Sequence, residues 1–171
     1  MKRILVTGAT GFVGSYICSK LLEDENNFLY VIARKKRMRT AQDRVLDAIA
    51  KCNEKVNIMD VKSRIKVFEG DIEEEQLGLS SQEYTCLKEE INVIYHSAAS
   101  IKFSLDYEDA KKINCGGTQK IVALMKEIHP EQFERLNYIS TAYVAGDYRK
   151  GFKETDLDVN QVFNNTYEQS K

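Results

Sequence analysis

Two side chains in the segment TYEQSK, residues 166–171, have the spacing of a catalytic pair: Tyr167 and Lys171. Residues four apart lie on one face of a helix, so a helix here would bring the phenol and the ammonium together. A lysine ammonium beside a phenol stabilises the phenolate, and the tyrosine can then pass a proton to or from a substrate oxygen near neutral pH. This spacing is common by chance, so its meaning depends on the rest of the sequence.

The segment VTGATGFVG near the N-terminus predicts a loop that binds the phosphates of a nucleotide. Its glycines follow an apolar strand pattern and enter a helical pattern. Glycine allows the main chain to approach a pyrophosphate closely, a helix N-terminus offers it free N–H groups, and the last glycine lets the helix lie close to the sheet. The alternative is a tight strand-to-helix turn without a ligand. The residues expected to contact the cofactor are Gly8, Thr10, Gly11, Phe12, Val13 and Gly14.

Basic residues stand where a site for NAD usually has an acid. Such a site places a carboxylate about 20 residues after the glycines, where it binds the ribose 2′-OH. Here Ala33 is followed by Arg34 and by the basic run 35–37. A guanidinium can bind a 2′-phosphate through two hydrogen bonds, so the sequence favours NADP over NAD. The alternatives are a solvated basic loop and a nucleic-acid patch, and the lack of interleaved aromatic residues argues against the patch.

These residues need a scaffold, and the hydrophobic pattern predicts an α/β domain. Short apolar segments, which predict buried parallel strands, alternate with longer amphipathic segments, which predict helices. The expected strands are residues 3–7, 28–33, 64–70, 92–99 and 135–144, and the expected helices are residues 12–22, 40–52, 80–89 and 106–128. Residues after Gly146 predict a polar loop, and Tyr167 would open a new helix.

Two further strand ends carry candidate binding residues. In the segment GDI, we expect Asp71 to accept a hydrogen bond from the adenine amino group and the neighbouring Ile72 to contact the cofactor. The alternative is an aspartate in a strand-end turn without a ligand. In the segment HSAAS, the small residues Ala98 and Ala99 would let a flat ligand approach. We interpret His96 as a packed strand residue rather than a ligand or base.

Composition limits the class of protein. The chain has 171 residues, 43% hydrophobic and 30% charged, with a net charge of −1, which is typical of one globular domain and does not favour nucleic acid or a membrane as the main partner. No apolar run approaches the ~20 residues of a membrane span. The cysteines lie far apart without a CxxC motif, so we expect reduced structural thiols, no metal site and a cytoplasmic location.

Taken together, TGATGFVG, GDI, HSAA, NCGGT, YISTAYVAG and YEQSK resemble, in this order, the motifs of extended short-chain dehydrogenases/reductases. The resemblance spans the whole chain and implies hydride transfer from a nicotinamide cofactor. It implies that Tyr167 is the acid/base, and that Lys171 tunes it and holds the nicotinamide ribose. Thr141 would position the substrate carbonyl, with Ser140 as the fallback. Asn114 matches the family's helix asparagine, and local hydrogen bonding is an equally good reading of it.

One branch of this family is especially similar. The stretch VIARKKRMRTAQDRV and the long insert between Arg34 and Ser63 resemble thioester reductases and fatty acyl reductases. Those enzymes use NADPH to reduce acyl thioesters, held on coenzyme A or a carrier protein, to aldehydes or alcohols. Arg34 and Arg44 would then meet the 2′-phosphate. The alternatives are an NAD(P)-dependent nucleotide-sugar epimerase or dehydratase and a non-catalytic dinucleotide sensor.

The resemblance also implies an architecture. We expect a Rossmann-type, doubly wound parallel sheet with strand order 3-2-1-4-5, truncated before the last strands. Residues 1–171 would be the N-terminal portion of the NAD(P)-binding domain, with the substrate-binding part absent. We expect this portion to contact the cofactor but not to turn over, because a short Tyr–Lys helix is not held in geometry. An open edge at the fifth strand predicts self-association, including a homodimer.

Overall fold

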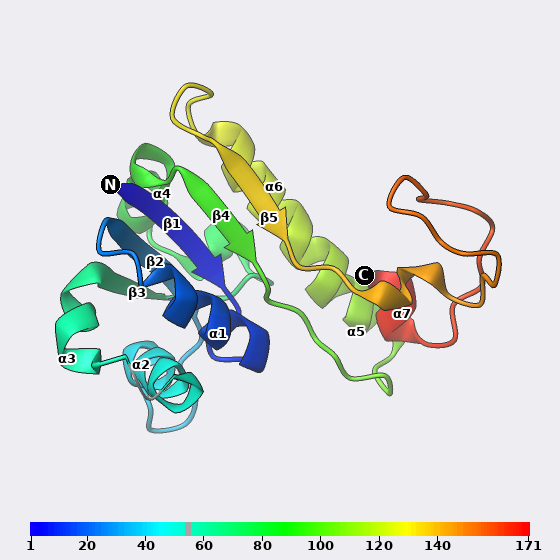
Figure 1. Cartoon of the computed structure of the whole chain (residues 1–171), viewed down its shortest axis with the longest axis horizontal. Coiled ribbons are helices and arrows are strands. Elements are labelled where there is room, and N and C mark those ends of the chain that lie inside the picture. Colours follow the sequence, from blue (N-terminus) through cyan, green and yellow to red (C-terminus); the bar gives the residue numbers. More distant parts are fainter. Residues whose placement is uncertain (54–55) are drawn as a thin grey trace.

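A parallel sheet of five strands forms the centre of the computed structural model, which describes residues 1–53 and 56–171. The strand order is β3-β2-β1-β4-β5 and all pairs are parallel, as the sequence predicts (Figure 1). The strands are β1 (Lys2–Thr7), β2 (Asn27–Ala33), β3 (Ile65–Glu69), β4 (Val93–His96) and β5 (Arg135–Tyr138). The order reverses between β1 and β4, and such a switch point is where α/β sheets bind ligands beyond the carboxyl ends of the strands.

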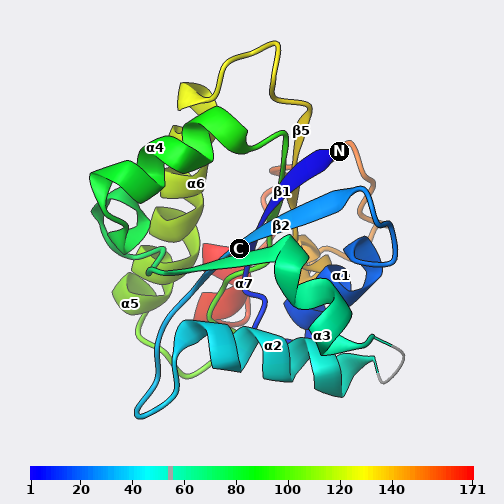
Figure 2. The ribbon, with the colours of Figure 1, turned by 90° about the vertical axis from the view of Figure 1, so that its left-hand side faces the viewer.

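Helices cover both faces of the sheet (Figure 2). One face carries α1 (Phe12–Leu21), α2 (Ala41–Cys52) and the short α3 (Ile58–Val61), and the other carries α4 (Ser81–Glu90), α5 (Tyr107–Lys111) and α6 (Gly117–Glu127). A π-helical turn, Lys112–Gly116, joins α5 to α6 into one continuous helical segment. The last helix is α7 (Thr166–Ser170). Side-chain caps stabilise the N-termini of α2 and α4. The Thr40 hydroxyl accepts from the Asp43 amide, and Ser80 forms a capping box with Glu83.

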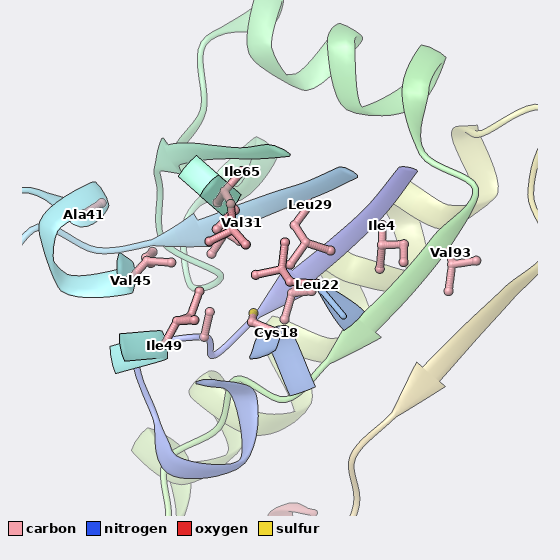
Figure 3. Close-up of a cluster of buried hydrophobic side chains, with 14 residues drawn as sticks. Ile4, Cys18, Leu22, Leu29, Val31, Ala41, Val45, Ile49, Ile65 and Val93 are labelled. Carbon is pink, nitrogen blue, oxygen red and sulfur yellow. The ribbon is translucent and has the colours of Figure 1, made fainter. Parts of the chain in front are cut away.

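Alternate residues of the central strands enter two separate hydrophobic clusters. On the α1–α2 face, Leu29 and Val31 pack with Cys18 and Ile49 (Figure 3). On the α4–α6 face, the intervening strand residues pack with Leu87, Ile121 and Leu124, among others. Burial on both faces explains why the strands read as continuous apolar runs, as in other parallel sheets. This core supports the strand ends at which the candidate site lies.

The fourth and fifth strands are shorter than the sequence predicts. β4 ends at His96 rather than at residue 99, and β5 ends at Tyr138 rather than at residue 144. The amide of Ile139 still donates to the carbonyl of His96, but β4 ends there, so the later residues have no neighbouring strand to pair with. The Thr141 hydroxyl instead accepts from the Tyr143 amide and caps a 3₁₀ turn.

Other expectations are met with small shifts. The predicted helix at residues 106–128 forms with Ile121 and Leu124 fully buried, interrupted by the π-helical turn. Residues 146–165 form no helix or strand, as the polar loop pattern predicts. The four cysteines carry free thiols. None of the helices in the described part of the chain has the length and apolar character needed to cross a membrane.

Candidate active site

A cavity of about 730 Å³ opens beyond the carboxyl ends of the strands, at the switch between β1 and β4. All predicted site residues lie in described parts of the chain, and all of them except Thr141 and Asn114 line this cavity. The predicted residues in the lining are Gly8, Thr10, Gly11, Phe12, Val13, Gly14, Arg34, Arg44, Asp71, Ile72, Ala98, Ala99, Tyr167 and Lys171. The phosphate loop and the proposed acid/base pair therefore face one shared space.

The glycine loop is packed so tightly at Gly8 and Gly14 that a side chain would not fit at either position. Gly8 has a φ of +78°, and a Cβ there would lie 2.7 Å from the Ala98 nitrogen. A Cβ on Gly14 would lie 2.2 Å from the Gly8 carbonyl oxygen. Gly11 caps the N-terminus of α1 and provides no side chain to satisfy its first amides. A bare main-chain cradle at a helix N-terminus fits a pyrophosphate, so the residues present suit a dinucleotide.

Charged side chains gather at the β2–β3 end of the cavity. The Arg34 guanidinium lies 3.3 Å from a carboxylate oxygen of Asp71 and 3.3 Å from one of Glu73. Arg44 donates to the Arg34 carbonyl and, at 3.4 Å, to the hydroxyl of Thr10. The predicted cations are thus both present, but Arg34 already has anionic partners. Glu73 was not predicted, because nothing in the local sequence pattern indicates that it faces Arg34.

At the opposite end of the cavity, Lys171 is held against the end of β5. Its ammonium donates to the Ile139 carbonyl at 2.8 Å and lies 4.4 Å from the ring centroid of Tyr138. The Tyr167 ring packs against Phe103, with 5.5 Å between centroids. Both Tyr167 and Lys171 are partly exposed and line the cavity, so both are accessible to a ligand in it.

Helix α7 is short, but hydrogen bonds from distant segments hold it. The hydroxyl of Ser170 accepts from the Asn114 side chain at 2.8 Å. The hydroxyl of Thr166 donates to the Leu105 carbonyl at 3.0 Å. Locally, the buried carboxylate of Glu168 accepts from the amides of residues 164–165 at 2.8–3.0 Å. A five-residue helix has little stability of its own, which is why the sequence led us to expect an unsupported pair. The tertiary contacts of α7 supply the stability that its short length lacks. That residues 1–171 alone do not turn over stays a prediction.

Asn114 and Thr141 occupy structural positions beside the cavity. Asn114 is buried in the π-helical turn, where its side chain accepts from the Ser100 amide and donates to the Ser100 carbonyl and to Ser170. It therefore joins the loop after β4 to α7. Thr141 caps its own turn, whereas Ser140, the fallback residue, lines the cavity. A catalytic role for either Thr141 or Asn114 stays a prediction.

Several cavity residues were not predicted. Ser97 and Ile139 directly follow strands and Ser100 lies four residues after β4, so the rule that strand carboxyl ends line the cleft could have found them. Ile101, Lys102, Leu105 and Ile113 also line the cavity. They come from the loop after β4 and from the π-helical turn, and no local sequence signal marked them.

His96 is fully buried and links β1 to the helix that follows β4. The Thr118 hydroxyl donates to the Asn114 carbonyl, so it can only accept from Nε2 of His96, at 3.1 Å. Nδ1 then accepts from the Thr7 hydroxyl at 2.7 Å, and that hydroxyl accepts from the Ala98 amide at 3.3 Å. This network requires a neutral imidazole and connects it to the cavity wall. The reading of His96 as a packed strand residue agrees with this placement.

His96 gives a prediction about pH and stability. Burial, with a smaller contribution from Lys171, lowers the pKa of His96 from 6.5 to about 4. Between these values the unfolded chain takes up a proton that the folded chain does not, so the free energy of unfolding must fall as pH falls through this window. The expected loss is about 2 kcal/mol between about pH 7 and pH 5.

Urea unfolding at the two pH values measures this effect. His96→Asn should show a smaller loss between them than the parent chain, and the matched variant His129→Asn should retain the full loss. Equal losses in the parent and His96→Asn would contradict the assignment.

No group of three or more His, Cys, Asp or Glu side chains that could hold a metal ion occurs within residues 1–53 and 56–171.

Comparison with known proteins shows the family to which the chain belongs. The family described as male sterility protein, an NAD-binding domain, matches residues 6–171. A Drosophila melanogaster protein named as a fatty acyl-CoA reductase is 34% identical over 150 residues, covering 84% of this chain. The chain spans 28% of the length of that relative.

Solved reductase domains share the fold over most of the chain. The terminal R domain from the myxalamid PKS-NRPS biosynthetic pathway is 30% identical with a TM-score of 0.83, covering 99% of this chain and 42% of that one. The PhqB reductase domain from Penicillium fellutanum is 31% identical with a TM-score of 0.67, covering 82% of this chain and 37% of that one. Similarity thus extends to a protein named for acyl-CoA reduction and to solved reductase domains, one of them from a PKS-NRPS biosynthetic pathway.

Proposed function

We propose that this chain, which belongs to the male sterility protein family of NAD-binding domains, is the cofactor-binding part of an acyl thioester reductase that uses NADPH. This family lies within the extended short-chain dehydrogenases/reductases. The observation that carries this proposal is the single cavity lined by both the glycine loop and the pair Tyr167 and Lys171. The names of the similar proteins support an acyl thioester as the substrate, on coenzyme A or a carrier protein. The product is an aldehyde or, after a second reduction, an alcohol.

The residues of this chain would divide the work along the cavity. The amides that follow Gly11 and the backbone at Gly8 bind the pyrophosphate, and Asp71 accepts from the adenine amino group. When bound, the cofactor supplies the hydride. Tyr167 holds a proton and donates it to the carbonyl oxygen of the substrate as that oxygen gains negative charge. Lys171, whose ammonium donates to the Ile139 carbonyl, would tune Tyr167 and bind the nicotinamide ribose.

A direct assay tests the proposed function. The complete product of the gene is incubated with NADPH and a long-chain acyl-CoA. Oxidation of NADPH is followed by the loss of absorbance of its reduced nicotinamide, and release of coenzyme A is followed as free thiol. We expect both signals to depend on both substrates. Conversion of a nucleotide sugar without oxidation of NADPH by any acyl thioester would instead favour the epimerase or dehydratase alternative.

Arg34 should determine the preference for NADPH. Arg34→Ala removes a guanidinium that can bind the 2′-phosphate, so the affinity for NADPH should fall by about tenfold while the affinity for NADH stays nearly constant. Calorimetric titration of each cofactor measures both constants. Arg37→Ala is the control, because it removes an exposed cation of the same basic segment. Equal losses for NADPH and NADH would reject the phosphate role of Arg34.

A further inference from the structure

Arg34, the cation expected to meet the 2′-phosphate, is shared between two carboxylates. The same Nη1 atom lies 3.3 Å from Asp71 Oδ2 and 3.3 Å from Glu73 Oε1. All three side chains line the cavity. The side chain of Arg34 is 64% exposed, whereas that of Glu73 is 19% exposed, so the arginine is free to turn away and the glutamate is not.

Glu73 is fixed by its own surroundings. Its amide donates to Asp71 Oδ1 at 3.1 Å, and its carbonyl accepts from the Lys120 ammonium at 3.0 Å. Its second carboxylate oxygen lies 3.9 Å from the Lys112 ammonium. The first two contacts fix the backbone at Glu73, and Lys112 gives its carboxylate a second cationic neighbour at the β3 end of the cavity.

Arg44 is turned toward the glycine loop rather than toward Asp71 and Glu73. It donates to the Arg34 carbonyl and to Thr10, which places its charge next to the glycine loop. A 2′-phosphate bound near the end of β2 would therefore meet Arg44 directly. It would gain the side chain of Arg34 only by competing with the carboxylates that hold it.

We propose that Glu73 is a specificity-determining residue, whose carboxylate competes with the 2′-phosphate of NADP(H) for Arg34 and reduces the preference for NADP(H) over NAD(H). This inference rests on the proposed function. Glu73 opposes binding of the 2′-phosphate in two ways. It occupies Arg34, so the phosphate must displace it to bind the guanidinium, and its negative charge repels the phosphate directly. Both effects concern the 2′-phosphate, so NAD(H), which has a hydroxyl there, should be nearly indifferent to Glu73.

Glu73→Gln tests the proposal with nearly unchanged shape. Calorimetric titration with NADP⁺ and NAD⁺ should give NADP⁺ affinity about threefold to fivefold higher than in the parent chain, the size expected for one partly exposed ion pair, with little change for NAD⁺. The gain should shrink at high salt, because screening weakens both effects. The matched control is Glu75→Gln, which removes a carboxylate that is 94% exposed and lies 3.8 Å from the Lys120 ammonium.

The double variant Arg34→Ala/Glu73→Gln separates competition from repulsion. If Glu73 acts mainly through Arg34, replacing Glu73 in the Arg34→Ala background should recover little NADP⁺ affinity. The proposal is overturned if Glu73→Gln behaves like Glu75→Gln, or if it weakens NADP⁺ binding, since the glutamate would then position Arg34 for the phosphate. If the parent chain binds neither cofactor, the proposed function fails, and this inference fails with it.

Discussion

Gly14→Ala should weaken dinucleotide binding by about 100-fold or more, a loss of about 3 kcal/mol. The added methyl group would lie 2.2 Å from the Gly8 carbonyl oxygen and 2.5 Å from the carbonyl carbon of the same residue. Because these are main-chain atoms, the loop or the start of α1 must move, and the cradle for the pyrophosphate opens. Overpacking of this kind should also lower the free energy of unfolding by about 1–3 kcal/mol.

The measurement is a calorimetric titration with NADPH, accompanied by far-ultraviolet circular dichroism to show that the variant is folded. Gly116→Ala is the control, because a Cβ there would meet only the Lys111 carbonyl oxygen, at 3.9 Å. That variant should bind NADPH as the parent chain does. A folded Gly14→Ala variant with unchanged affinity would show that the glycine loop is not the phosphate site.

Tyr167→Phe should lower the turnover of an acyl thioester by about 100-fold to 10,000-fold, the range expected when a general acid is removed. The ring and its contact with Phe103 remain, so only the phenolic hydroxyl is lost. NADPH affinity should change little, because the proposed contacts to the cofactor come from the glycine loop, the β2–β3 end and Lys171. Single-turnover oxidation of NADPH in the complete gene product measures the chemical step.

Tyr143→Phe is the matched control. Tyr143 is 58% exposed on the 3₁₀ turn after β5, so removal of its hydroxyl should leave turnover unchanged. Comparable turnover in Tyr167→Phe and the parent protein would remove Tyr167 from the mechanism. A large loss of NADPH affinity in Tyr167→Phe would instead assign it a binding role.

Much of the scaffold follows from local patterns in the sequence. The five strands and the starts of the main helices were predicted because each depends on short apolar runs, caps and glycines, whereas the strand order was implied by the family resemblance. The end of β5 was not predicted correctly, because residues 139–144 have strand-forming character and it is the end of the neighbouring β4 that stops the pairing. The sequence of one segment cannot report where its partner ends.

The candidate site divides in the same way. The glycine loop and the spacing of Tyr167 and Lys171 are local features, so the sequence was sufficient to find them. The support of α7 by Asn114 and the pairing of Arg34 with Glu73 join segments 39 or more residues apart, and they depend on the three-dimensional packing. The contacts that hold Arg34 and α7 in place are therefore those that the sequence did not reveal.

The central claim is that one cavity holds the cofactor from the glycine loop to the Tyr–Lys pair. Amide chemical shifts of the chain, at 19.6 kDa within reach of NMR, test it most directly when NADPH and 2′,5′-ADP are added in separate titrations. The adenosine fragment should shift the amides of residues 8–14 and 71–73, and NADPH should also shift those of residues 167–171. Shifts confined to other surfaces, or none with either ligand, would contradict the claim.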